Sequence, residues 1–216
     1  MFQPKDTLLN RGYDVEYLNP FVFYRPQEYS MGSSDNVIIG ASINARIKNT
    51  TVYSQVVLDE FLLSEIRARS GWWANKFGAQ LGIMGILSDK LSYRIEGNLV
   101  RPFTFSHLTP LQVYGHRGSA LAHTYGSNFA EILTELNWSK NINPKLKIRF
   151  FASFGVRGSN VDSLNYGSDI YESYINRPND FGNYIGQSIK QTFFITNTRD
   201  SVLLHLKLAV LGKMVL

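Results

Sequence analysis

The stretch FAEILTELNWSKNINPKLKIRFFASFGV, residues 129–156, decides the fold that the sequence predicts. Apolar and polar residues alternate along both of its halves, and a period of two over about ten residues is typical of a β-strand with one apolar and one polar face. The apolar faces consist of Ala130, Ile132, Leu136 and Trp138, then Leu146, Ile148, Phe150, Ala152, Phe154 and Val156. The opposite faces carry Glu131, Glu135 and Asn137, then Lys147, Arg149 and Ser153.

The turn between the two runs predicts how they pair. Residues 141–144 form a polar segment of the kind that closes an antiparallel hairpin. If this turn sets Asn137 opposite Lys147, then Glu135 lies opposite Arg149. Because opposite charges at facing positions stabilise an antiparallel pair, we expect a ladder of charges along the polar face.

The same alternation recurs on both sides of this hairpin. Further strands are predicted at residues 20–25, 37–47, 51–61, 74–87, 91–100, 188–196 and 202–211. The segment LLSEIRARSGWW is polar enough for a loop with one helical turn, and TRDS is a short turn. We therefore divide the chain into a polar lead-in, residues 1–19, and a single β-domain, residues 20–216.

The links between these strands are long and short in alternation. In an up-and-down antiparallel sheet, alternate links lie at the same end, so all long links would gather at one end, as they do in outer-membrane barrels. The predicted fold class is all-β: an antiparallel up-and-down transmembrane β-barrel, with about nine strands in this chain as part of a larger barrel. A soluble β-sandwich or lipocalin-like barrel, which also alternates, is the least favoured alternative.

Strand length and aromatic position favour the membrane. The strands approach the roughly 9–11 residues that cross a bilayer at a tilt, and Phe21, Phe23 and Trp138 lie at strand ends, where aromatic girdles occur. An odd strand number conflicts with the even numbers of single-chain bacterial barrels, so we expect a segment that is incomplete at both ends. No apolar run is long enough for a membrane helix.

Composition narrows the possible functions and locations. The formal net charge is +5, but Lys and Arg are spread along the chain, so we expect no nucleic-acid partner. The absence of cysteine excludes disulfides and thiolate metal sites. The first residues, MFQPKDTLLNRGYD, contain no signal-peptide core, so the chain is either cytosolic or lacks its start; the expected location is the outer membrane.

The sequence contains no residue pattern that is typical of a catalytic or metal-binding site. The four histidines lack tight metal-ligand spacing, and no GxSxG motif accompanies the serines near them. Asp59 and Glu60 are neighbours in a predicted strand and therefore face opposite ways, while Glu131 and Glu135 fit a charged lumen better than a glycosidase pair. We predict no enzymatic activity, no metal and no cofactor.

The long links contain aromatic and basic residues that could hold a glycan. Aromatic rings stack on sugar rings, and arginine pairs with uronate or phosphate groups. The candidate ligand-binding residues are Trp72, Trp73, Arg67, Arg69, Arg101, His107, His116, Arg117 and His123. The alternative is that such aromatic residues form an interfacial girdle or pack the loops.

The charged faces of the strands predict a second set of residues, which would line the lumen of the barrel. These residues are Arg46, Arg94, Glu96, Glu131, Glu135, Lys147, Arg149 and Lys207. They leave open a further function, a passive or substrate-selective pore for small solutes.

Four segments resemble a known family. They are EYLNPFVFYRPQEYSMGSSDN (residues 16–36), LDEFLLSEIRARSGWWANKFGAQLGI (58–83), VRPFTFSH (100–107) and ALAHTYGSNFAE (120–131). They resemble the Bacteroidetes outer-membrane barrels of the capsule-assembly Wzi-like or gliding-motility RemB-like family, over most of residues 16–158. Such proteins are larger barrels with a signal peptide and an N-terminal half that this chain lacks.

The resemblance implies a role at the cell surface and no catalytic residues. We expect the protein to bind or help assemble surface or capsular polysaccharide, or to support gliding motility. The expected partners are the lipid bilayer, surface polysaccharide or lipopolysaccharide, and proteins of gliding or secretion machinery. A structural component of such a machine remains an alternative beside the pore.

Overall fold

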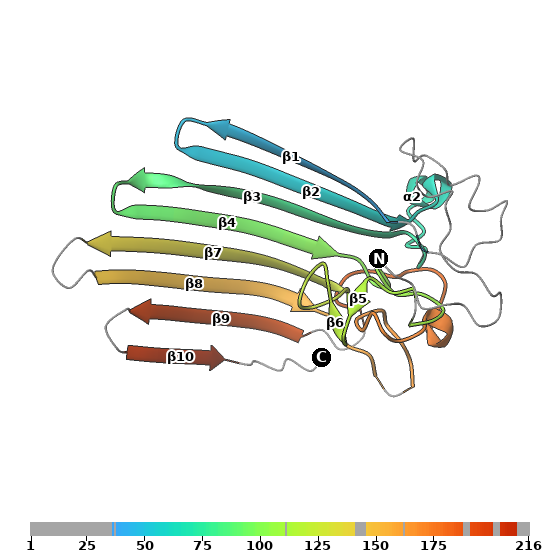
Figure 1. Cartoon of the computed structure of the whole chain (residues 1–216). Helices are drawn as coiled ribbons and strands as arrows, with labels where there is room; N and C mark the ends of the chain where they lie inside the picture. The colour runs from blue at the N-terminus through green and yellow to red at the C-terminus, as the bar shows by residue number, and fades with distance from the viewer. Residues whose placement is uncertain are drawn as a thin grey trace.

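The computed structural model describes residues 36, 38–110, 112–140, 146–161, 163–187, 191–200 and 204–210. The predicted lead-in, residues 1–19, and the strand predicted at 20–25 lie outside the described residues. Within the described part, the chain is mostly β-structure and forms one large antiparallel sheet (Figure 1).

Eight strands form this sheet, and each lies beside its neighbour in sequence order. They are β1 (Ile39–Ile47), β2 (Thr50–Glu60), β3 (Lys76–Ser88), β4 (Leu91–Val100), β7 (Phe129–Lys140), β8 (Leu146–Arg157), β9 (Gln191–Asp200) and β10 (Leu204–Val210). All their ladders are antiparallel. The prediction of an up-and-down antiparallel sheet is confirmed.

Long and short links lie at opposite ends of the sheet. Four small elements lie in the long links: α2 (Leu63–Ala68), the hairpin of β5 (Gly115–His116) and β6 (Ser119–Ala120), and the 3-10 turn η2 (Tyr174–Asn176). They gather at the right-hand end in Figure 1, which we call the loop end. The helical turn expected in LLSEIRARSGWW is α2.

Two details of the predicted strands are wrong. Asn137 pairs with Arg149 and Glu135 with Phe151, whereas the sequence suggested Lys147 and Arg149 as the partners. The predicted register would pair Pro144 with a β7 residue, and proline has no N–H to donate to a ladder. The TRDS turn is also misplaced, because β9 continues through three of its residues and pairs along β8 as far as Asp200.

The two faces of the sheet differ in chemistry and in exposure. We call the face that carries Ile132 the apolar face and the face that carries Glu131 the polar face. On the apolar face, Ile132 is 58% exposed and Phe154 is 53% exposed, whereas Glu131 on the polar face is 7% exposed. Other exposed residues of the apolar face are Ile39, Ile43, Ile47, Val56, Leu81, Ile95, Leu136 and Phe150.

The long links fold over the polar face at the loop end. A small apolar core forms there from Val100 and Phe129 of the sheet, Phe105 from the β4–β7 link, and Ile170 from the β8–β9 link. Phe105 has a positive φ of 70°, a conformation that is uncommon for a bulky side chain and therefore marks a tightly constrained loop. The polar face is thus covered at this end by the protein's own loops.

The described strands form an open sheet. Among them, β1 pairs with β2 alone and β10 with β9 alone. Within the described residues, no helix is both long and apolar enough to cross a membrane.

Candidate functional site

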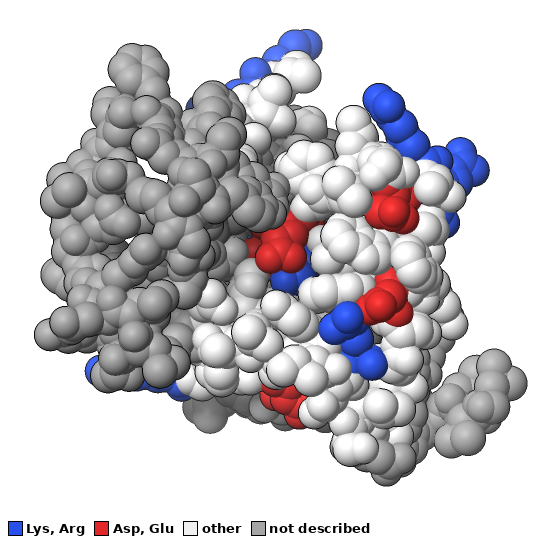
Figure 2. Space-filling view, turned by 90° about the vertical axis from the view of Figure 1, so that its right-hand side faces the viewer, with Lys and Arg blue, Asp and Glu red and all other residues white. Residues whose placement is uncertain are grey.

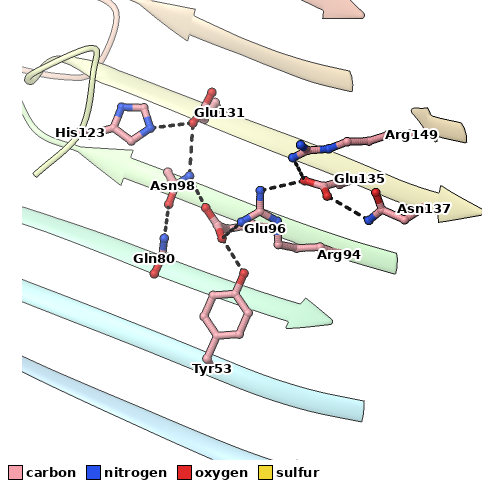
Figure 3. Close-up of polar contacts among 10 residues, drawn as sticks. All are labelled: Tyr53, Gln80, Arg94, Glu96, Asn98, His123, Glu131, Glu135, Asn137 and Arg149. Carbon is pink, nitrogen blue, oxygen red and sulfur yellow. Dashed lines mark hydrogen bonds and ion pairs between the residues drawn. The ribbon is translucent and has the colours of Figure 1, made fainter. Parts of the chain in front are cut away.

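A network of polar side chains occupies the middle of the polar face (Figure 3). Asn98 of β4 lies at its centre, because its Nδ2 donates to Glu96 Oε1 at 2.9 Å and to Glu131 Oε1 at 3.2 Å. Gln80 of β3 donates from Nε2 to Asn98 Oδ1 at 3.1 Å. The hydroxyl of Tyr53 on β2 donates to the Glu96 carboxylate. Side chains from three adjacent strands are therefore joined to β7 through one asparagine.

The loop that covers the polar face is tied to this network by a histidine. His123 Nε2 lies 2.9 Å from Glu131 Oε1, and its ring stacks on Phe129 with the centroids 4.4 Å apart. Ser153 of β8 donates to the other Glu131 oxygen at 2.9 Å. Burial raises the pKa of Tyr125, whose ring lies beside His123, and the Glu131 carboxylate raises it further.

A second charged cluster lies nearer the short turns. Glu135 accepts hydrogen bonds from Arg149 Nη2 at 2.7 Å, Arg94 Nη2 at 3.2 Å and Asn137 Nδ2 at 2.9 Å. Glu135 and Arg149 therefore meet as a diagonal pair although they are not directly opposite in the ladder. In this second cluster two arginines flank one carboxylate, whereas in the first network neutral donors satisfy Glu96 and Glu131.

The register places the predicted lumen residues of β1, β4, β7 and β8 on the polar face, and the backbone of Lys207 is in line with them. One row of paired residues crosses the whole sheet, and it contains four of the predicted lumen positions. Each residue of the row pairs with the next in consecutive ladders: Arg46, Thr51, Met84, Arg94, Glu135, Phe151, Asn197 and Lys207. The remaining four predicted residues are each an even number of positions away from a residue of this row on the same strand, so they lie on the same face. They are Glu96, Glu131, Lys147 and Arg149.

A buried lysine organises the loop end. The Lys76 side chain has no exposed surface; its Nζ donates to the Ser106 carbonyl at 2.9 Å and lies 3.2 Å from Glu60 Oε2. Next to it, Asp59 Oδ1 lies 3.2 Å from His107 Nε2, and Asp59 Oδ2 accepts the Phe105 backbone N–H at 2.8 Å. These contacts join β2 and β3 to the β4–β7 link.

Several predicted ligand-binding residues take part in these internal contacts. Arg101 donates to the backbone carbonyls of Asn75 at 3.0 Å and Asn183 at 2.7 Å, and burial lowers its pKa. The Trp73 ring lies between Phe103 and Tyr174, with centroid distances of 5.9 and 4.6 Å. Arg101, Trp73, His107 and His123 are thus held within the protein and do not form one open surface.

The other predicted ligand-binding residues remain accessible at the loop end. Arg67 and Arg69 lie on or directly after α2, and His116 and Arg117 lie in the β5–β6 hairpin; all four are exposed. Trp72 is half-buried, with its ring edge-on to Trp73. Figure 2 views this end and shows basic and acidic side chains scattered among uncharged residues rather than one patch of a single sign.

A cavity of about 480 Å³ lies between the polar face and the loop that covers it. Its sheet side includes Val57, Gln55 and Gln80, and its loop side includes Tyr114 and His123. Among the described residues, no group of three His, Cys, Asp or Glu side chains is placed to hold a metal ion. The contacts described for the site are hydrogen bonds, ion pairs and ring contacts.

Sequence reasoning missed the residues that connect the clusters. Tyr53, Gln80, Asn98 and Ser153 are uncharged and were passed over, although each lies at a polar-face position of a predicted strand. Their positions, each an even number of residues from a charged residue of the same strand, could have identified them. Lys76 gave no such signal, because its partners lie in segments far along the chain.

No protein-family model, no curated protein and no solved structure matches the chain. The site is defined by its fold and its contacts alone.

Proposed function

We propose that this chain is part of the wall of a transmembrane β-barrel in an outer membrane, with the apolar face toward lipid and the polar face toward an enclosed, hydrated lumen. The observation that carries this proposal is the inverted burial of β7. Ile132 is 58% exposed, whereas its neighbour Glu131 is 7% exposed and fully hydrogen-bonded. A soluble sheet buries its apolar side chains, whereas a barrel in lipid exposes them.

The dimensions of the strands agree with this proposal. Strands β2, β3, β4, β7 and β8 contain 10 to 13 residues. A tilted strand of roughly 9–11 residues spans the hydrocarbon core. Further strands beyond β1 and β10, in this chain or a partner, would then be needed to close the barrel, because open edges are unfavourable in lipid.

For the function of this barrel, we propose binding or assembly of surface polysaccharide. The accessible aromatic and basic side chains at the loop end support it, since Trp72, Arg67, Arg69 and Arg117 combine a ring surface with groups that bind uronate or phosphate. Capsular polysaccharide and lipopolysaccharide carry such groups. Gliding or secretion machinery would use the same end to contact protein.

Paired cysteine variants test the membrane orientation. The sequence has no cysteine, so single substitutions give a unique label. Gln55 and Val56 are adjacent on β2, both exposed, and face opposite sides. In vesicles, a fluorophore on Val56→Cys should be quenched by lipid-borne quenchers, and one on Gln55→Cys by a water-soluble quencher. Equal access of the water-soluble quencher to both positions would contradict the proposal.

Retention on immobilised polysaccharide tests the function. We expect the double variant Arg67→Ala, Arg117→Ala to lose most retention on an acidic polysaccharide, because both residues are exposed at the loop end and carry groups that pair with uronate or phosphate. The matched control is Lys48→Ala, an exposed cation at the opposite end of the sheet. Unchanged retention of the double variant would count against the polysaccharide role.

The charged row on the polar face favours a second candidate, a pore for small solutes. A lumen lined by Arg94, Glu135 and Arg149 would be hydrated and ion-selective. Planar-bilayer conductance of the protein separates the two functions. Steady ion conductance that changes its selectivity in Glu135→Gln would favour the pore, and a silent bilayer would favour the polysaccharide role.

A further inference from the structure

The cavity beneath the covering loop differs from the rest of the polar face because its lining contains no lysine, arginine, aspartate or glutamate. The described lining residues include Val57, Val100 and Phe129 from one row of the sheet, and Gln55, Gln80 and Asn98 from the next row. Lysine, arginine, aspartate and glutamate do not occur among these lining residues. A charged ligand would meet no arginine, lysine or carboxylate in this cavity and would lose its hydration.

The two rows divide the cavity into an apolar side and a hydrogen-bonding side. On the apolar side, Tyr114 and His123 from the loop lie over the sheet, and the Tyr114 side chain is 37% exposed. On the other side are the amides of Gln55 and Gln80, which lie opposite each other across the β2–β3 ladder. An amide offers both donors and acceptors on one planar group.

These amides keep hydrogen-bonding capacity for a ligand. Asn98 is fully engaged, since it accepts from Gln80 and donates to Glu96 and Glu131. Among the described residues, Gln80 uses a single N–H of its amide, which leaves its Oε1 and second N–H available. The Gln55 side chain is exposed on the same face. The network therefore fixes Asn98 and Gln80 in position while leaving polar atoms toward the cavity.

We propose that this cavity binds a neutral sugar unit. A pyranose has an apolar face of C–H groups, which fits the Tyr114 side, and a rim of hydroxyls, each a donor and an acceptor, which fits the Gln55 and Gln80 amides. The volume of about 480 Å³ lies within the range of ligand cavities, roughly 300–1,000 Å³. The inference rests on the proposed glycan-binding function and adds a second subsite, without arginine, lysine or carboxylates, to the exposed arginines of the loop end.

Two glycines provide a matched test of the cavity. Gly40 lines it, and a Cβ added there would meet one atom within 4 Å, the Val56 carbonyl oxygen at 3.6 Å, so Gly40→Leu fits the strand and extends into the cavity. Gly97 lies on the apolar face, where an added Cβ would meet the carbonyls of Glu131 at 3.9 Å and Leu81 at 4.0 Å. Gly97→Leu therefore makes the same change outside the cavity.

The experiment measures binding of a panel of neutral trisaccharides, in gluco, galacto and manno forms, and of trigalacturonate to the full chain in micelles. We expect a neutral trisaccharide to bind, with a Kd raised about ten-fold or more by Gly40→Leu and by Gln55→Leu, and within about two-fold of the parent in Gly97→Leu. Identical unfolding midpoints of the two leucine variants at glycine positions would show that the sheet is intact.

Two results would overturn the subsite, and they differ in what they say of the proposed function. If trigalacturonate binds and no neutral sugar does, or if Gly40→Leu leaves neutral-sugar binding unchanged, the cavity is not a sugar site while the polysaccharide role at the loop end stands. If no member of the panel binds and the acidic polysaccharide is not retained either, both proposals fail together.

Discussion

Replacing one residue of the apolar face by arginine distinguishes a sheet that contacts lipid from a sheet that contacts water. Ile95 is the fifth of the ten residues of β4, 45% exposed, and flanked in the ladders by Ile83 and Thr134. If β4 crosses a bilayer, the place of Ile95 halfway along the strand puts it near the midplane. Arginine at the midplane of a barrel's lipid face costs about 2–4 kcal/mol, and the cost falls to about 0–1 kcal/mol near the interface.

Almost no change in stability is expected if this face meets water. An exposed isoleucine in water can be replaced by arginine with a change within about 0.5 kcal/mol, because no burial is lost. Ile95→Arg should therefore lower the free energy of unfolding by about 3 kcal/mol if the face contacts lipid, and by almost nothing if it contacts water. The difference is several times the error of a denaturant titration.

Two control variants test whether the effect depends on depth in the bilayer and on the face of the sheet. Ile47→Arg changes the last residue of β1, on the apolar face near the short turns, and should cost about 0–1 kcal/mol. Gln55→Arg changes an exposed polar-face residue and should stay within about 0.5 kcal/mol. Urea or guanidinium titrations of the protein folded into vesicles, followed by tryptophan fluorescence, give all three values. Equal stability of Ile95→Arg and the parent would refute the membrane orientation.

Three further predictions concern the polar contacts. Glu131→Ala should lower the free energy of unfolding by about 1.5–3 kcal/mol, because three hydrogen-bond donors lose a charged acceptor; an unchanged denaturation midpoint would show that water replaces the carboxylate. Lys76→Met should cost about 1–3 kcal/mol, because the buried Ser106 carbonyl loses its donor; limited proteolysis should then cut residues 101–128 faster, and equal cleavage rates would contradict the role of Lys76. Arg101→Lys should expose the same loop to protease, since a lysine cannot reach both carbonyls that the guanidinium bridges; rates matching the parent would refute this.

The strands were predictable because each one carries its own pattern. In β7 and β8, alternation identifies strand, faces and partner at once, and β4 begins and ends at the predicted residues, Leu91 and Val100. Register was less certain, because facing charges are compatible with two neighbouring alignments. The lack of a donor at Pro144 favours the observed alignment over the predicted one.

The loop end could not be predicted because its contacts join distant segments. Asp59 meets His107, and Lys76 meets the backbone of Ser106, across 48 and 30 positions of sequence. Such pairs leave no period and no motif in a single chain. For the same reason, residues chosen for their chemistry, such as Arg101, were expected at an open surface but lie within the packed loops.

The neighbour-to-neighbour order of the strands has a consequence for how the protein is made. Every ladder of the sheet joins strands that follow one another in the chain, apart from the small β5–β6 hairpin inserted between β4 and β7. Closing each pair therefore requires no earlier strand to be displaced, so assembly can advance one hairpin at a time from either side. The covering loops can dock on the polar face last, after the strands beneath them have paired.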